Sequence, residues 1–404
     1  MEFKKYKLGE ITEITAGGDA PNNYTKEPNS VNSIPIFSNG IENEGLYGYT
    51  NFSKIDRNSF TISARGTIGV SFKRNKPYYP IVRLLSVVPK NDYFDVDYLY
   101  YASKLFKFKK DGSVQQQLTI PMLSEIELMI PSLKNQQKIS TLLNFIDDKI
   151  TLNRRINTKL EALAKRLYDY WFVQFDFPNA DGKPYKSSGG KMEYNGVLKR
   201  EIPAGWEVTP LKKCIKHINT GLNPRDNFVL GNGNIKYVTV KNLTESGMID
   251  FSNCDLIDEE ARAMVHNRSD IKIGDILFAS ICPLGRCYLI NEEPKDWDIN
   301  ESVFTIRPNY KNMSSQLLYS ILRDEYYVKK MTQKATGSIF KGIRVDDLEK
   351  IEIVLPSKGI VDSFTTKIIP ILNQQAKLQQ ESMKLSEMRD KLLPLLMNGQ
   401  VEVK

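Results

Sequence analysis

The side chains best suited to chemistry in this sequence are amide and guanidinium groups in short turn sequences. In the first half they occur in Ser38-Asn39-Gly40, in Ala64-Arg65-Gly66-Thr67 and in the tract Gln115-Gln116-Gln117. Asn and Gln pair with adenine, and Arg pairs with guanine, through two hydrogen bonds each. These turns therefore predict recognition of base edges by hydrogen bonding, without bond breaking.

The second half carries a related set of polar turn residues. They are Lys241, Asn242, Ser280, Arg286, Ser338 and Lys341. A single residue of this kind is more often part of a solvated turn, whereas recurrence in both halves favours a shared role in binding. We therefore predict that DNA contacts come from Ser38, Asn39, Arg65, Gly66, Thr67 and the three glutamines in the first half, and from these six residues in the second.

Signatures of catalysis are weak. Cys214 and His217 form one C-x2-H pair, and Cys282 and Cys287 lie five residues apart, so the paired spacing of a zinc site is missing. Reduced, structural thiols are the favoured interpretation, and a metal site stays as an alternative. We expect no metal and no catalytic residue in this chain.

Nucleotide and methyl-transfer motifs are also missing from the sequence. The segment GSIFKGIR has Ile343 where a phosphate-binding loop requires Lys, and no NPPY or DPPY tetrapeptide supplies an aromatic side chain for a flipped base. Asp346-Asp347 would suit Mg²⁺, but a solvated helix start explains this pair equally well. The pattern predicts a binding protein that directs other subunits.

A long-period repeat determines how these residues must be positioned. Residues 112–133 and 337–358 both begin with Gly-Ser and end near Pro-Ser, at an offset of 225 residues. Further upstream, residues 63–69 match 279–285, and residues 6–12 match 209–215. Self-similarity over such a period indicates duplication of a whole domain.

Each copy reads as a beta-rich α+β domain. Strand patterns occur at 34–40, 83–89, 235–242, 274–280 and 302–308, with helical patterns at 95–106 and 314–327. We place the first domain at 1–132, its helix at 133–175, a linker at 176–206, the second domain at 207–357 and its helix at 358–404. The linker is rich in Gly, Pro, Ser and Lys and lacks periodicity.

The two tails have the heptad pattern of long helices. We assign helix–helix or partner contacts in the first to Ile139, Leu142, Ile146, Leu160, Leu163 and Leu167, and in the second to Phe364, Ile371, Leu378, Leu385 and Leu392. Pro370 and Pro394 favour a kink or a late start in the second helix. The alternative is that each helix packs only on its own domain.

The order domain, helix, domain, helix favours antiparallel pairing of the two helices. The expected fold is thus two similar domains separated by an antiparallel coiled-coil spacer, an internal repeat with pseudo-two-fold symmetry. Such an arrangement suits double-stranded DNA, on which paired half-sites lie about 34–36 Å apart.

Composition is consistent with these interpretations. A length of 404 residues predicts two domains, and a formal charge of +8 favours a polyanionic partner. No apolar run approaches the ~18 residues that cross a membrane, and no signal peptide is recognised. We therefore expect a cytoplasmic protein.

The central segment resembles a known family. Residues 163–211, above all the run from Trp171 to Trp206, resemble the central region of type I restriction-modification specificity subunits. RGTIG at 65–69, Pro131-Ser132 with Gln136-Gln137 and the repeated tails resemble the same family. In the second tail, IVDSF stands where the first has NQQKI, so the two junctions differ.

The resemblance implies a non-catalytic subunit with two target-recognition domains. It would bind two methyltransferase subunits and two motor-nuclease subunits, and would direct adenine methylation and restriction at a bipartite target. S-adenosylmethionine, ATP and Mg²⁺ would be bound by the partners and none of them by this chain. The alternatives are a free-standing DNA-binding regulator and an enzyme with unrecognised motifs.

Overall fold

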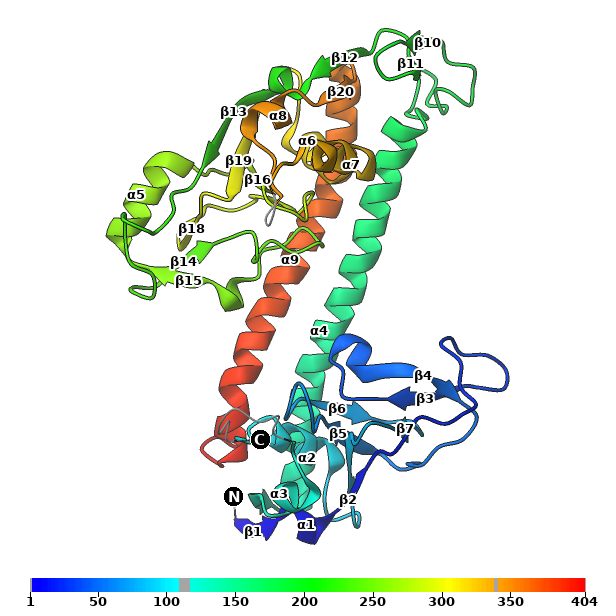
Figure 1. The fold of residues 1–404 in the computed structure, drawn as a ribbon, viewed down its shortest axis with the longest axis vertical. Coiled ribbons are helices and arrows are strands. Elements are labelled where there is room, and N and C mark those ends of the chain that lie inside the picture. Colours follow the sequence, from blue (N-terminus) through cyan, green and yellow to red (C-terminus); the bar gives the residue numbers. More distant parts are fainter. Residues whose placement is uncertain (1, 109–116, 338–340, 404) are drawn as a thin grey trace. The chain divides into compact units, whose positions relative to one another are not determined.

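The computed structural model describes residues 2–108, 117–337 and 341–403. The chain forms two compact units, one from Met1–Asn153 with Gln380–Lys404 and one from Arg154–Gln379 (Figure 1). Both long helices, α4 (Leu133–Tyr168) and α9 (Lys358–Met397), contribute residues to each unit. We call them unit 1 and unit 2 and describe each by itself.

Unit 1 is built from three small sheets. Its strands are β1 (Phe3–Lys7), β2 (Thr12–Ala16), β3 (Ile34–Phe37), β4 (Leu46–Thr50), β5 (Ser59–Ile62), β6 (Ser71–Arg74), β7 (Tyr79–Pro80), β8 (Leu85–Pro89) and β9 (Glu127–Pro131). The strand orders are β2-β8-β5-β6, β4-β3-β7 and β1-β9, and only the β3-β7 pair is parallel. Its helices besides α4 and α9 are α1 (Leu8–Ile11), the 3-10 turn η1 (Glu42–Gly45), α2 (Val96–Ser103) and α3 (Ile120–Ser124).

Unit 2 contains the same three sheets and an additional hairpin. Its strands are β10 (Met192–Asn195), β11 (Arg200–Pro203), β12 (Glu207–Pro210), β13 (Ile215–Thr220), β14 (Ile235–Val238), β15 (Asp255–Ile257), β16 (Ile276–Ala279), β17 (Cys287–Leu289), β18 (Trp297–Ile299), β19 (Val303–Pro308) and β20 (Glu352–Leu355). Its short helices are η2 (Asp169–Val173), η3 (Leu211–Cys214), η4 (Phe251–Asn253), α5 (Glu259–Ser269), α6 (Ser315–Arg323), α7 (Glu325–Lys334) and α8 (Val345–Glu349). The orders β13-β19-β16-β17, β15-β14-β18 and β12-β20 repeat those of unit 1, and β14-β18 is again the parallel pair.

Backbone hydrogen bonds define which residues are equivalent in the two units. The bond from Leu118 N to Ala64 O recurs as Ile343 N to Ser280 O, at the offset of 225 seen in the sequence. The bond from Ile81 N to Phe37 O recurs as Asn300 N to Val238 O. The duplication predicted from the sequence, with a beta-rich α+β fold in each copy, is therefore confirmed.

Each unit has its own apolar core beneath a capped helix. In unit 1 the core includes Leu8, Phe60, Tyr98 and Ile139, and in unit 2 it includes Phe278, Leu318 and Phe364. Asp95 caps α2 by accepting from Tyr98 N, and the equivalent Ser314 caps α6 by accepting from Leu317 N. These caps begin each helix at the point where it covers the larger sheet.

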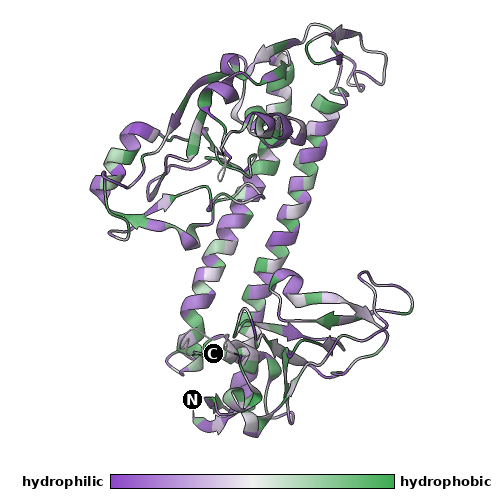
Figure 2. Ribbon diagram, viewed as in Figure 1, coloured by the Kyte–Doolittle hydropathy of each residue, from purple (hydrophilic) through white to green (hydrophobic). Residues whose placement is uncertain are grey.

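The two long helices run antiparallel within unit 1. Arg389 Nη1 lies 2.7 Å from Asp147 Oδ1, and Asn153 Nδ2 lies 2.9 Å from Glu381 Oε2, so residue numbers rise along α4 as they fall along α9. The buried positions of α4 in this unit are Ile139, Leu143, Ile146 and Ile150. Leu142 is partly buried against the same core, and Leu163, in unit 2, is 43% exposed. Figure 2 shows polar and apolar residues interspersed along both helices.

The remaining contact residues predicted on the two helices fall into two groups. Phe364 and Leu378 are buried, while Leu160, Leu167, Ile371, Leu385 and Leu392 are half-buried. In unit 2, Phe364 packs against Tyr168, Trp171 and Phe172, with ring centroids 4.8 Å apart for the Phe172–Phe364 pair. The start of α9 is therefore held by aromatic side chains.

Two details of the expected organisation differ in the structure. The second helix begins at Lys358 and passes through Pro370, so the expected late start is wrong. The range 176–206, expected to be a linker, contains the β10-β11 hairpin, and Phe177 stacks on Trp206 with ring centroids 4.9 Å apart. Composition alone did not reveal this packing because the anchoring aromatic residues are widely spaced. Within the described residues, no helix is long and apolar enough to cross a membrane.

Candidate nucleic-acid interface

Three turns and one loop residue meet in unit 1. The turns follow β3, follow β5 and join β7 to β8; β3 and β7 are parallel, so their carboxyl ends lie at the same edge. Asn39 joins the turns, because its Oδ1 accepts from Ala64 N at 2.8 Å and its Nδ2 donates to Val82 O at 2.5 Å. Thr67 Oγ1 donates to Asn39 O at 3.3 Å. The amide of Asn39 therefore holds the loops together.

Two guanidinium groups converge on one amide oxygen beside these turns. Gln117 Oε1 accepts from Arg65 Nε at 3.2 Å and Nη2 at 2.9 Å, and from Arg83 Nη1 at 3.3 Å. Both arginines are exposed and Gln117 is half-buried. The cluster concentrates hydrogen-bond donors and positive charge at the surface, as an acceptor-rich ligand requires.

Sequence reasoning selected most of this cluster and missed Arg83. Ser38 donates from its backbone N to Gly45 O at 2.8 Å, and Gly66 is exposed with φ of 68°, a left-handed value that favours glycine. Gln115 and Gln116 lie outside the described residues. Arg83 was read as the first residue of a strand, since Ile81-Val82-Arg83 contains none of the usual turn residues.

The candidates of unit 2 are engaged differently. Asn242 is 3% exposed, and its Oδ1 accepts from Thr239 N at 2.8 Å while its Nδ2 donates to Asp250 O at 3.1 Å. Ser280 Oγ donates to Ser302 O at 2.7 Å. The side chains of Asn242 and Ser280 therefore brace turns of the domain.

The cations predicted in unit 2 are more accessible. Arg286 Nη2 lies 3.2 Å from Glu245 Oε1, while Lys241 and Lys341 are exposed. Ser338 lies outside the described residues. The position equivalent to Arg65 is Ile281, one residue after Ser280. The two units thus present different side chains at equivalent turns.

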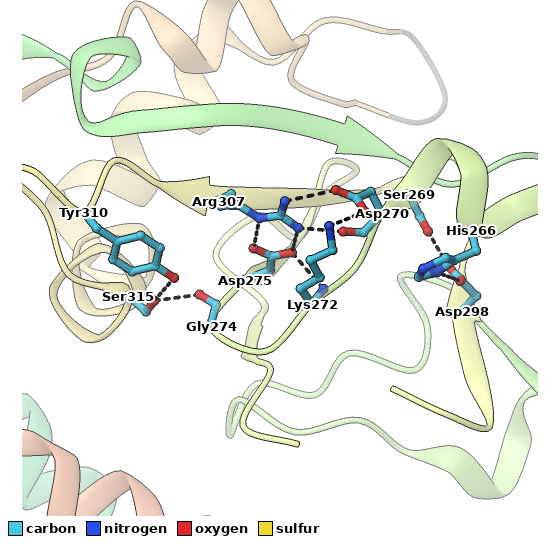
Figure 3. A network of polar contacts seen from close by, with 10 residues as sticks. All are labelled: His266, Ser269, Asp270, Lys272, Gly274, Asp275, Asp298, Arg307, Tyr310 and Ser315. Atoms are coloured by element: carbon cyan, nitrogen blue, oxygen red, sulfur yellow. Dashed lines mark hydrogen bonds and ion pairs between the residues drawn. The ribbon is translucent and has the colours of Figure 1, made fainter. Parts of the chain in front are cut away.

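A buried polar network supports the larger sheet of unit 2 (Figure 3). Arg307 on β19 donates from Nε and Nη2 to the two oxygens of Asp275 at 2.7 and 2.6 Å, and from Nη1 to Asp270 Oδ2 at 3.0 Å. The hydrogen bonds to Asp275 raise the pKa of Arg307, and those from Lys272 and Arg307 lower the pKa of Asp270. Asp275 is fully buried, so its charge depends on this pairing.

The same region contains Ser269, His266 and Asp298, the residue types of a hydrolytic triad, in a different arrangement. Ser269 Oγ donates to Asp298 Oδ1 at 2.6 Å, and His266 Nδ1 lies 2.9 Å from Asp298 Oδ2. Burial raises the pKa of Asp298. The serine is hydrogen-bonded to the carboxylate, whereas a nucleophile requires the imidazole as its base. This network is therefore structural.

The cysteines have the properties of structural thiols. Burial raises the pKa of Cys214 to about 11, that of Cys254 to about 11 and that of Cys287 to about 12, so these thiols are protonated at neutral pH. Among the residues that the structure describes, no three His, Cys, Asp or Glu side chains gather closely enough to hold a metal ion.

Comparisons with known proteins agree with this architecture. The family model described as type I restriction modification DNA specificity domain matches residues 1–162 and 203–384, one match for each half. The MjaIX type I restriction enzyme specificity subunit of Methanocaldococcus jannaschii is 28% identical over 428 residues, which cover 98% of this chain and 93% of that protein. The HindI specificity subunit of Haemophilus influenzae is 26% identical over 74% of each chain.

A solved structure has the same fold. The crystal structure of the S subunit of a type I restriction-modification system from M. genitalium aligns with a TM-score of 0.64, covering 98% of this chain and 96% of that one, at 14% identity.

Proposed function

Because this chain belongs to the family of type I restriction modification DNA specificity domains, we propose that it is the sequence-reading subunit of a type I restriction-modification complex. It recognises a bipartite target on double-stranded DNA and directs methylation and restriction there. The observation that carries the proposal is the duplicated sheet architecture, in which equivalent turns present different side chains. Two such readers suit a target with two unlike halves.

The chemistry belongs to partner subunits. Two adenine methyltransferase subunits bind S-adenosylmethionine, and two motor-nuclease subunits bind ATP and Mg²⁺. This chain holds none of these cofactors and catalyses neither reaction. The long helices provide the main partner surface, because half-buried and exposed apolar residues such as Leu160 and Leu163 remain on α4.

The direct test is to express the chain with and without its methyltransferase partner and to map methylated adenines in the host genome. We expect one bipartite motif, and only when both proteins are present. Replacing residues 1–132 with those of another family member should change one half of the motif, and replacing residues 207–357 should change the other half.

Two outcomes would contradict the proposal. Methylation or cleavage of DNA by the purified chain alone would identify an enzyme with unrecognised motifs. Specific DNA binding without any association with a methyltransferase subunit would identify a free-standing regulator.

A further inference from the structure

The turn between β7 and β8 is strained at two consecutive residues. Val82 has φ of 53° and Arg83 has φ of 58°, both in the left-handed region that β-branched and long side chains avoid. Strain of this kind persists only where the surroundings enforce it, and it concentrates at functional positions.

The surroundings of this turn enforce it from several sides. Val82 N donates to Gly18 O and Arg83 N donates to Gly17 O, each at 2.8 Å, and Val82 O accepts from the side chain of Asn39. A Cβ atom at Gly17 would lie 2.6 Å from the backbone of Pro80 and Ile81, so this approach requires glycine. The chain is therefore built to hold the turn in one conformation.

The strained conformation displays two side chains. Val82 is 50% exposed, and Arg83 projects to Gln117 beside Arg65. Within the described residues, the printed bond of Arg83 uses Nη1 alone, so its Nε–Nη2 edge is available for a second partner. Two parallel N–H groups on one edge match the O6 and N7 acceptors of guanine.

Building on the proposed function, we propose that Arg83 reads a guanine in the first half of the DNA target, with Arg65 and Gln117 orienting its guanidinium and Val82 packing on the neighbouring base edge. An apolar side chain beside the arginine favours a groove edge, where a thymine methyl group is available, over a charged phosphate. Unit 2 has Glu301 and Ser302 at the positions equivalent to Val82 and Arg83. This reader is therefore confined to unit 1.

The test uses the chain assembled with its methyltransferase partner. The wild-type motif is mapped first, and the half that changes when residues 1–132 are exchanged must contain a G·C pair. Arg83→Lys, which keeps the charge but loses the paired N–H edge, should reduce discrimination at that pair by roughly 5- to 150-fold. The other half of the motif should stay unchanged, which shows in the same molecule that the complex is folded.

Arg83→Ala and Lys5→Ala provide the comparison between base and phosphate contacts. Lys5 is an exposed cation on β1 paired with Glu127, and its loss should leave discrimination at the G·C pair intact. The proposal fails if Arg83→Lys leaves discrimination unchanged, or if Arg83→Ala weakens all sequences equally and lowers the salt dependence of binding by about one ion. It also fails if the first half-site specifies only A·T pairs. A wild-type complex that yields no bipartite motif would instead overturn the proposed function itself.

Discussion

Units 1 and 2 use the same strands to carry two different turns. In unit 1 the residues after Ile81 are left-handed and are held by Asn39, Gly17 and Gly18. In unit 2 the equivalent turn starts at Asn300, whose Oδ1 accepts from Ser302 N at 3.1 Å, and φ is not positive at Glu301 or Ser302. The comparison teaches that sheet pairing sets where the turn lies, while neighbouring side chains set what it presents.

The helices contrast in a similar way. In unit 1, Asp147 on α4 accepts from Arg389 on α9 at 2.7 Å and from Tyr101 on α2 at 2.8 Å. In unit 2, aromatic rings around Phe364 occupy the corresponding region between the helices. The polar seam should depend on pH and the aromatic seam should not, because only the first contains a titrating group.

The largest expected effect separates the two units by stability. Arg307→Ala leaves the fully buried Asp275 without its guanidinium partner and should destabilise unit 2 by ~3–5 kcal/mol. Hydrogen exchange should show loss of protection in β16 and β19 while β5 and β8 stay protected. Lys272→Ala, which removes an exposed cation from the same network, should change stability by less than ~1 kcal/mol. Equal loss of protection in both units would show that they do not unfold independently.

The next effect concerns the amide that joins the unit 1 turns. Asn39→Ala leaves Ala64 N and Val82 O without their partner and should destabilise unit 1 by ~1–3 kcal/mol. Readout of the first half-site should weaken, as measured by binding to duplexes with single substitutions. Val240→Ala changes the equivalent position of unit 2 and should leave both properties nearly unchanged. Full first-site readout by Asn39→Ala would show that the turns do not need this amide.

The polar seam gives a prediction about acid. Burial alone would raise the pKa of Asp147, but hydrogen bonds from Arg389 and Tyr101 outweigh it and lower the pKa below the ordinary 3.8. A depressed folded-state pKa contributes stability above the ordinary value, and this contribution is lost as pH falls through the folded-state value. Asp147→Asn should therefore reduce stability by ~1–2 kcal/mol at pH 7 and flatten the acid limb of the unfolding profile. An unchanged acid limb would contradict this assignment.

The smallest expected effect on stability is at the strained turn. Val82→Gly removes left-handed strain of ~1–2 kcal/mol and costs ~0.5–1 kcal/mol in backbone entropy, so the melting temperature should stay the same or rise slightly. The first half-site should nevertheless be read less selectively because the apolar contact is lost. A clear fall in melting temperature would mean that Val82 stabilises the domain by packing, and the contrast with unit 2 would lose its functional meaning.

Local patterns and the repeat determined much of the fold from sequence alone. The offset of 225 residues, the two helical tails and the strand patterns before them predicted duplicated β-rich domains, because these features depend only on neighbouring residues and on comparison of the chain with itself. Arg65 and Gln117 were identified by residue type, since few side chains can make paired contacts with bases.

Tertiary structure alone decided which of these residues meet. Arg65 and Gln117 are separated by 52 residues in sequence, and they come together with Arg83 because parallel β3 and β7 end at one edge beside the β5 turn. Val82 and Arg83 carry no turn signature of their own, so their left-handed conformation follows from Asn39, Gly17 and Gly18, which are distant in sequence. A pattern of neighbouring residues records propensity, whereas a strained turn is determined by the contacts that enclose it.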